Sequence, residues 1–265
     1  MTATVPDILA RIVARKHEEL LELRPRLADL ERQAAERVGQ QRGFRKRLAQ
    51  DAPAVIAEVK KASPSKGVLA ADFRPVEIAG AYEAGGASAV SVLTDRDFFQ
   101  GSMGDLEAVR AAIRLPVLRK DFTLEEAHIV EAAAHGADAI LLIAALFTAA
   151  EMRRLREFAQ GLGLDALVEV HDGEELSRVV DSGADLIGVN NRDLRTFAVR
   201  LETSLDLAAR IPSYALPVSE SGIFTRSDVE LLSGAGYRAF LVGESLMKSG
   251  DAAGAIRELR GGLRG

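Results

Sequence analysis

The sequence predicts an α/β fold, a closed (β/α)8 TIM barrel with an N-terminal helical extension. From residue 54 onward, a short β-rich run, a polar or glycine loop and a segment of helical periodicity alternate without interruption. Eight such units fill the rest of the chain, and eight is the number that closes a parallel barrel. No strand is followed by a Gly-x-Gly-x-x-Gly turn, which argues against the alternative, an open doubly wound sheet.

The eight units can be placed along the chain in order. Strands are expected at residues 54–60, 88–93, 116–120, 138–144, 166–171, 185–190, 217–220 and 238–243. Helices are expected near residues 75–85, 104–114, 124–135, 148–161, 172–182, 202–211 and 225–235, and from about 251. Gly-Ala pairs that begin at Gly86, Gly136, Gly183 and Gly234 mark joints from helix to strand, because glycine tolerates the left-handed conformation that ends many helices.

The first fifty residues differ from the rest, because they contain no predicted strand. Apolar residues such as Ile8 and Ile12 give residues 6 to about 48 an amphipathic helical pattern, with Pro25 as a break. We expect residues 1–50 to form a helical extension that packs on a barrel of residues 51–265, within a single domain. A helix that binds a partner is the alternative.

The composition narrows the class of protein. With 48% hydrophobic residues, the chain has enough apolar material for a large core. A net charge of −5 argues against a general nucleic-acid binder, and the absence of cysteine removes disulfides, thiolate metal sites and cysteine nucleophiles. The longest apolar run, Ala139 to Phe147, is too short to cross a bilayer, and no apolar signal region is present. We therefore expect a cytoplasmic protein without a membrane partner.

Polar residues gather where the predicted strands end, and barrel enzymes carry their active sites at those ends. Charges inside buried runs such as Leu167-Val168-Glu169 are costly unless they have partners or a chemical task. The polar and small residues at these ends are Glu58, Lys60, Lys120, Glu169, Asn190, Arg192, Glu220, Ser221, Gly222, Gly243 and Glu244. This pattern predicts an active site, and an ion-pair network that only tightens the barrel mouth is the alternative.

Two features of these ends indicate the chemistry. Only 7 of the 34 basic residues are lysine, yet Lys60 and Lys120 both close strands, and lysine exchanges protons more readily than arginine does. After the last two strands, small residues at Ser221-Gly222 and Gly243 stand before predicted helices, and barrels often bind phosphate there. The sequence thus predicts proton transfer on a phosphorylated small molecule.

The histidines give a weaker signal. No carboxylate–histidine cluster has the spacing of metal ligands, so no metal is expected. His17, His128 and His135 lie on predicted helices and are expected in solvent. His171 is in phase with Glu169 and can face the mouth, but a structural role is the preferred interpretation.

Six motifs in order resemble the indole-3-glycerol phosphate synthase family, over nearly the whole chain. They are Glu58-x-Lys60-x-x-Ser63-Pro64-Ser65, Leu118-Arg119-Lys120-Asp121-Phe122, Leu167-Val168-Glu169-Val170-His171, Ile187-Gly188-Val189-Asn190-Asn191-Arg192-Asp193-Leu194, Ser219-Glu220-Ser221-Gly222-Ile223 and Leu241-Val242-Gly243-Glu244-Ser245-Leu246-Met247. Glu244 stands where some members carry serine. The resemblance implies ring closure, decarboxylation and dehydration of 1-(2-carboxyphenylamino)-1-deoxyribulose 5-phosphate to indole-3-glycerol phosphate in tryptophan biosynthesis. It implies no cofactor, and we expect a monomer.

The resemblance, together with the residue chemistry, suggests roles. Lys120 is the expected general acid of ring closure and Lys60 that of dehydration, while either Glu58 or Glu169 is the base. The residues expected to bind substrate are Ser63, Phe122, Asn190, Arg192, Glu220, Ser221, Gly222, Gly243 and Glu244. Phe122 would pack on the anthranilate ring.

Two other functions compete with this one. An isomerase of phosphoribosyl anthranilate usually relies on a cysteine and an aspartate, and this chain has no cysteine. A non-catalytic barrel that binds a metabolite or a protein is the second, and the intact set of acids and bases argues against it.

Overall fold

The computed structural model describes residues 7–64, 66–70 and 72–262 and contains a closed barrel of parallel strands. Around the barrel the strands follow the order β1-β10-β9-β8-β7-β6-β5-β4, so neighbours in sequence are neighbours in space. The strands are β1 (Ala54–Val59), β4 (Ala89–Leu93), β5 (Val117–Lys120), β6 (Ala139–Ile143), β7 (Asp165–Val170), β8 (Leu186–Asn190), β9 (Leu216–Glu220) and β10 (Ala239–Val242). The predicted (β/α)8 barrel is confirmed, with each strand within two residues of its expected bounds.

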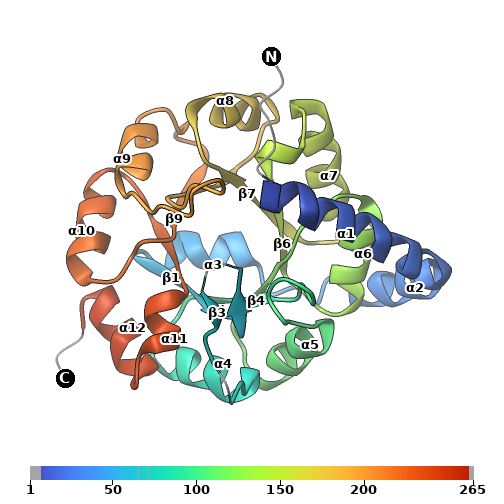
Figure 1. The fold of residues 1–265 in the computed structure, drawn as a ribbon, viewed down its shortest axis with the longest axis horizontal. Coiled ribbons are helices and arrows are strands. Elements are labelled where there is room, and N and C mark those ends of the chain that lie inside the picture. Colours follow the sequence, from blue (N-terminus) through green and yellow to red (C-terminus); the bar gives the residue numbers. More distant parts are fainter. Residues whose placement is uncertain (1–6, 65, 71, 263–265) are drawn as a thin grey trace.

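Helices alternate with these strands and form the outer ring (Figure 1). They are α4 (Pro75–Ala84), α5 (Met103–Ala112), α6 (Glu126–Ala134), α7 (Ala149–Gly161), α8 (Gly173–Asp181), α9 (Glu202–Ala208), α10 (Arg226–Gly234) and α12 (Ala252–Arg260). Thr225 caps α10 in a reciprocal box with Asp228, which satisfies backbone N–H groups that have no partner inside the helix.

Three of the four predicted left-handed glycines are confirmed, since Gly86, Gly136 and Gly183 have φ of 85°, 86° and 76°. The prediction is wrong at the fourth joint. Gly234 is the last residue of α10, and the left-handed residue is Gly236, with φ of 110°. The helix therefore runs further than the Gly-Ala pair suggests.

The N-terminal segment lies against both ends of the barrel. It contains α1 (Asp7–Leu23), the 3₁₀ helix η1 (Arg24–Arg26), α2 (Leu27–Arg37) and α3 (Phe44–Gln50). Pro25 lies in η1, which confirms the predicted break. From α3, Phe44 and Leu48 join the cluster that fills the barrel interior, beside the N-terminal ends of the strands. From α1, Leu9 reaches the same cluster at the opposite end, where α1 crosses the mouth near β6 and β7 (Figure 1).

Alternation along the strands separates two cores. In β1, Val55 and Ala57 pack outward against the helices, whereas Ile56 points into the barrel. Apolar interior side chains such as Leu118 and Leu167 fill the barrel from its base. Two residues further along those strands, the interior positions hold Lys120 and Glu169. The apolar core therefore ends directly beneath a charged layer.

Three short elements have no counterpart among the predicted residue ranges. A hairpin of β2 (Ala62–Ser63) and β3 (Gly67–Val68) follows β1, the 3₁₀ helix η2 (Ala144–Leu146) follows β6, and α11 (Glu244–Lys248) follows β10. Each is shorter than two turns of helix or three residues of strand, so none leaves a periodic pattern. Among the described residues, no helix combines the length and apolarity that crossing a membrane requires.

Candidate active site

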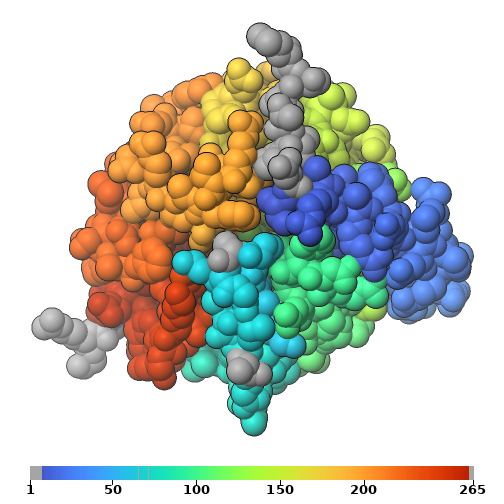
Figure 2. Space-filling view, viewed as in Figure 1, coloured from blue at the N-terminus to red at the C-terminus, as the bar shows by residue number. Residues whose placement is uncertain are grey.

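A pocket opens at the mouth of the barrel, where the C-terminal ends of the strands meet. On this face the β2–β3 hairpin, the loop after β8 and α1 meet near the centre (Figure 2). The predicted site residues on its wall are Glu58, Lys60, Ser63, Lys120, Phe122, Glu169, Asn190, Arg192, Ser221, Gly222, Gly243 and Glu244. Residues separated by up to 186 positions in sequence are thus brought around one cavity by the closed barrel.

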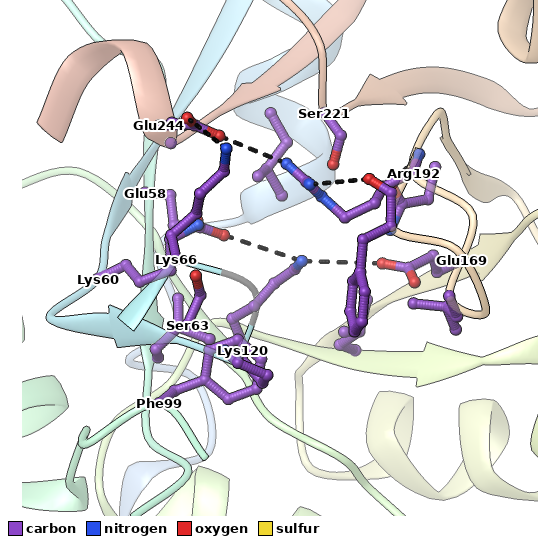
Figure 3. A pocket seen from close by; sticks show the side chains of 18 of the residues that line it. Glu58, Lys60, Ser63, Lys66, Phe99, Lys120, Glu169, Arg192, Ser221 and Glu244 are labelled. Atoms are coloured by element: carbon purple, nitrogen blue, oxygen red, sulfur yellow. Dashed lines mark hydrogen bonds and ion pairs between the residues drawn. The ribbon is translucent and has the colours of Figure 1, made fainter. Parts of the chain in front are cut away.

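Lys120 stands among three carboxylates, of which Figure 3 shows Glu58 and Glu169. Its Nζ lies 3.5 Å from Glu220, 3.7 Å from Glu169 and 3.9 Å from Glu58. Burial by itself would lower the pKa of Lys120, but the attraction of these carboxylates outweighs burial and raises that pKa above its ordinary value. Lys120 therefore holds its proton at neutral pH while it faces the pocket.

Lys60 lies beside the same layer and contacts Glu58 through an ion pair. Burial favours the protonated form of Glu58, yet Lys60 and Lys120 together lower its pKa. Residues two apart on a strand point to the same face, and both Glu58 and Lys60 line the pocket. Gly243, directly after the neighbouring strand β10, makes room for Glu58, because a Cβ there would overlap the Glu58 carboxylate.

Glu169 and Glu220 are two buried carboxylates beside Lys120, and their surroundings give them different pKa values. Burial and the nearby charge of Glu169 raise the pKa of Glu220 to about 8. For Glu169, burial acts in the same direction, but Lys120 and His171 outweigh it and lower its pKa. At pH 7, Glu169 is therefore ionised and Glu220 carries a proton. Two carboxylates that share one ammonium group cannot both ionise cheaply in a buried site.

Glu220 lies beneath the pocket and is absent from its wall, unlike the other predicted site residues. It is 1% exposed, and neither carboxylate oxygen has a hydrogen-bond partner in the described part of the chain. Gly188 on the neighbouring strand provides its space, since a Cβ at Gly188 would overlap the Glu220 carboxylate. The structure thus places Glu220 against Lys120.

The glycine turns after β9 and β10 differ from each other. Gly243 caps α11, as expected of small residues before a helix. After β9, α10 begins only at Arg226, so Ser221-Gly222 does not stand at a helix start as predicted. Instead Ser221 and Gly222 have φ of 66° and 78°, and Asn191 donates a hydrogen bond to the Ser221 carbonyl. This turn is left-handed at two consecutive residues and exposes backbone rather than a helix end.

Cations gather around Glu244 at the rim of the pocket (Figure 3). Its carboxylate lies 2.7 Å from Lys248, 3.5 Å from Arg192 and 3.9 Å from Lys66. These cations can bind a phosphate or a carboxylate group of a ligand in addition to Glu244. Lys66 was not predicted as a site residue, although its place among the few lysines of the chain was a signal for it.

An apolar side of the pocket faces this charged side. Phe122 and Phe99 pack with their ring centroids 6.2 Å apart and both line the pocket. Ile8 and Ile12 of α1, which were predicted only as part of an amphipathic helix, also line it, together with Leu9. A flat aromatic group fits between such surfaces.

Lys16 is a buried residue next to the site, and it was not predicted from the sequence as part of the site. It is 2% exposed, and its Nζ lies 2.8 Å from Asp121 and 2.9 Å from both Asp95 and Glu19. Asp121 directly follows Lys120, so this ion cluster ties α1 to the end of β5. A signal existed, because Lys16 follows Ile12 by four residues and so shares the apolar face of α1.

The histidines were predicted incorrectly in one case. His17 is exposed, as expected, and His135 is partly exposed in a pair with Glu107. His128 is only 3% exposed, and its Nδ1 accepts a hydrogen bond from the Leu124 backbone. The helical pattern of α6 misled the prediction, because α1 and α2 both pack against α6. Within the described residues, no group of three or more His, Asp or Glu side chains could hold a metal ion.

Fold and site together define a (β/α)8-barrel enzyme with acid–base groups at the C-terminal mouth. Among solved structures, a mandelate oxidase variant with an FMN adduct has the same fold, with a TM-score of 0.57 at 17% identity over 78% of this chain and 71% of that one. At this identity the likeness concerns the fold alone.

Sequence comparisons identify the family. The model of the family "Indole-3-glycerol phosphate synthase" matches residues 9–259. An indole-3-glycerol phosphate synthase of Desulfotalea psychrophila is 50% identical over 96% of this chain and 98% of its own length. Another, from Koribacter versatilis, is 52% identical over 89% of this chain and 91% of its own length. The chain belongs to the indole-3-glycerol phosphate synthase family, whose members are carboxy-lyases of tryptophan biosynthesis.

Proposed function

We propose that this chain converts 1-(2-carboxyphenylamino)-1-deoxyribulose 5-phosphate into indole-3-glycerol phosphate, carbon dioxide and water, with Lys120 as the first proton donor. One observation carries the proposal: the Lys120 ammonium group lies among three carboxylates at the floor of a pocket with cations at its rim. Such a site holds an anionic substrate and supplies a proton inside a low-dielectric cavity.

Ring closure joins the ring carbon that carries the carboxylate to the ketone carbon of the substrate. The ketone oxygen gains negative charge as this bond forms, and a proton from Lys120 Nζ neutralises it. The ring carboxylate then leaves as carbon dioxide, and its bonding electrons restore the ring. Because Lys120 remains beside the ionised Glu58 and Glu169, these carboxylates favour its return to the charged form before the next turnover.

Dehydration follows. It needs an acid that protonates the leaving hydroxyl group and a base that removes a proton close to the ring. Lys60 lines the pocket and forms an ion pair with Glu58, so it suits the role of acid. Glu58 and Glu169 are both ionised and both face the pocket, so the geometry supports either as base. Separate Glu58→Gln and Glu169→Gln variants, assayed for the dehydration step, distinguish them.

The pocket also orients the substrate in this proposal. Its phosphate would contact Ser63, the Ser221-Gly222 turn and the backbone at Gly243-Glu244. Arg192 would bind an anionic group of the substrate, and Asn190 orders this segment because its Oδ1 accepts a hydrogen bond from the Arg192 backbone. Phe122 would pack on the anthranilate ring, and Glu220 would act from beneath the substrate through Lys120.

We also infer that residues 1–50 and 51–265 form one domain, because α1 and α3 both contribute side chains to the barrel interior. A monomer in the cytoplasm, with a phosphorylated small molecule and no nucleic acid or membrane as partner, completes the proposal. Sedimentation of the purified chain and fractionation of its source cells test these two points.

The decisive experiment supplies the carboxyphenylamino-deoxyribulose phosphate and follows indole fluorescence. The wild-type chain should form product, and Lys120→Ala should lower turnover at least about 100-fold while the protein stays folded by circular dichroism. Lys46→Ala is the matched control, because Lys46 is an exposed lysine on α3 at the other end of the barrel. Binding of substrate without product in the wild type would refute the proposed function, and near-wild-type turnover in Lys120→Ala would remove Lys120 from its role.

A further inference from the structure

His171 lies behind the catalytic layer and connects two carboxylates. Its Nε2 is 3.2 Å from Oε1 of Glu169, and its Nδ1 is 3.2 Å from Oε2 of Glu175 on α8. That same Glu175 oxygen accepts the backbone N–H of His171 at 2.8 Å. The contact with Glu169 is an ion pair rather than a well-aligned hydrogen bond. Glu175 therefore fixes the ring, and the ring faces Glu169.

The two oxygens of Glu169 have different partners as a result. Oε1 faces His171, and Oε2 lies 3.7 Å from the ammonium group of Lys120. Glu169 is 3% exposed, so its negative charge needs compensation from within the protein. Lys120 alone cannot compensate it fully, because Lys120 also lies 3.9 Å from Glu58, which is ionised as well.

We propose that His171 and Glu175 are positioning residues that hold Glu169 ionised and aimed at Lys120. In this arrangement His171 is an imidazolium that neutralises Glu169 from behind, and Glu175 keeps the imidazolium charged and oriented. The inference rests on the proposed place of Glu169 in the catalytic layer. It goes further by giving a task to two residues that need not touch substrate.

The groups around His171 support its positive charge. Glu169 on its own strand and Glu175 on α8 contact the ring, and they raise the pKa of His171 to about 10 although burial opposes this. The cavity beside His171 is lined by charged residues from the N-cap of α8, α8 itself, the loop after β8 and α9. These are Asp172, Glu174, Glu175, Arg178, Asp193, Arg195, Arg200, Glu202 and Asp206. On the side of the barrel mouth, Glu169 lies between the His171 ring and the ammonium group of Lys120.

The charge state of His171 can be measured without any substrate. The chain has four histidines, so ¹⁵N-histidine NMR resolves them, and loss of one set of signals in His171→Gln assigns His171. We expect His171 to remain a protonated imidazolium up to pH 8. A His171 signal that titrates near the ordinary value of about 6.5 would overturn it. In Glu175→Gln, which keeps an acceptor for both N–H groups but loses the charge, the titration should move to lower pH.

Kinetics test the effect on Glu169. Without the His171 cation the pKa of Glu169 rises, so the acidic limb of kcat/KM should move to higher pH, by about one pH unit or more in His171→Gln. His135→Gln is the matched control, because His135 also pairs with a carboxylate, Glu107, but lies far from the pocket. Identical pH profiles for the two variants would refute the inference. If the wild type forms no product, the proposed function fails, while the NMR titration still decides the state of His171.

Discussion

Replacing Lys16 with methionine should destabilise the protein and disturb the pocket, although Lys16 lies outside the pocket wall. Methionine has a similar volume and leaves Asp95 and Asp121 without this cation. Asp121 keeps Arg119 at 3.3 Å and a hydrogen bond from Thr94, whereas Asp95, which is fully buried, loses the ion pair of its Oδ2. Removing one partner from a buried ion pair typically costs about 3–5 kcal/mol, so we expect a loss of this size in the free energy of unfolding.

The pH dependence of this loss has a definite sign. Burial opposes ionisation of Asp121, but Arg119 and Lys16 hold its pKa well below the usual range. Stability from a carboxylate with a lowered pKa is present above its ordinary pKa and is lost as the pH falls. In Lys16→Met the pKa of Asp121 rises, so Asp121 protonates at a higher pH. The difference from wild type should therefore be largest near pH 7 and smaller near pH 4.

Urea unfolding followed by circular dichroism measures both effects, and Lys46→Met, at an exposed position of α3, is the control. Because Lys16 also ties α1, with Leu9 and Ile12, to the pocket, KM should rise more than kcat falls. A loss below about 1 kcal/mol at pH 7, the size typical of an exposed pair, would show that the cluster is not the anchor we infer.

Two further predictions concern the carboxylate pair beneath Lys120. Because the pKa of Glu220 rises to about 8 on folding, this group makes the wild type less stable as the pH climbs from about 4.5 to 8. Glu220→Gln should flatten that decline in urea unfolding, and an unchanged slope would contradict it. Gly188→Ala should displace the Glu220 carboxylate and lower kcat about 100-fold. Gly234→Ala, where a Cβ meets nothing within 4 Å, should leave kcat unchanged, and equal rates in both variants would exclude the packing argument.

Local patterns explain why so much of the fold could be predicted. Strand β7 is recognisable from Leu167-Val168-Glu169-Val170 alone, and the charge in that apolar run also marks its C-terminal end. The same rule found Lys120 and Glu58, because interior positions repeat every two residues. Local patterns failed for Gly234 and His128. At Gly234 the length of α10 decided the outcome, and at His128 the packing of neighbouring helices on α6 did.

Local sequence patterns are enough to predict the barrel, the end that carries the site and most of the side chains that face the pocket, because these depend on periods of two and 3.6 residues. Only the tertiary structure decided which charges meet. It placed Lys16 against Asp121, set Glu220 beneath Lys120, and put His171 behind Glu169. Ion pairing and pKa values depend on distances in space and on burial. For residues on different strands, neither quantity can be read from their positions in the sequence.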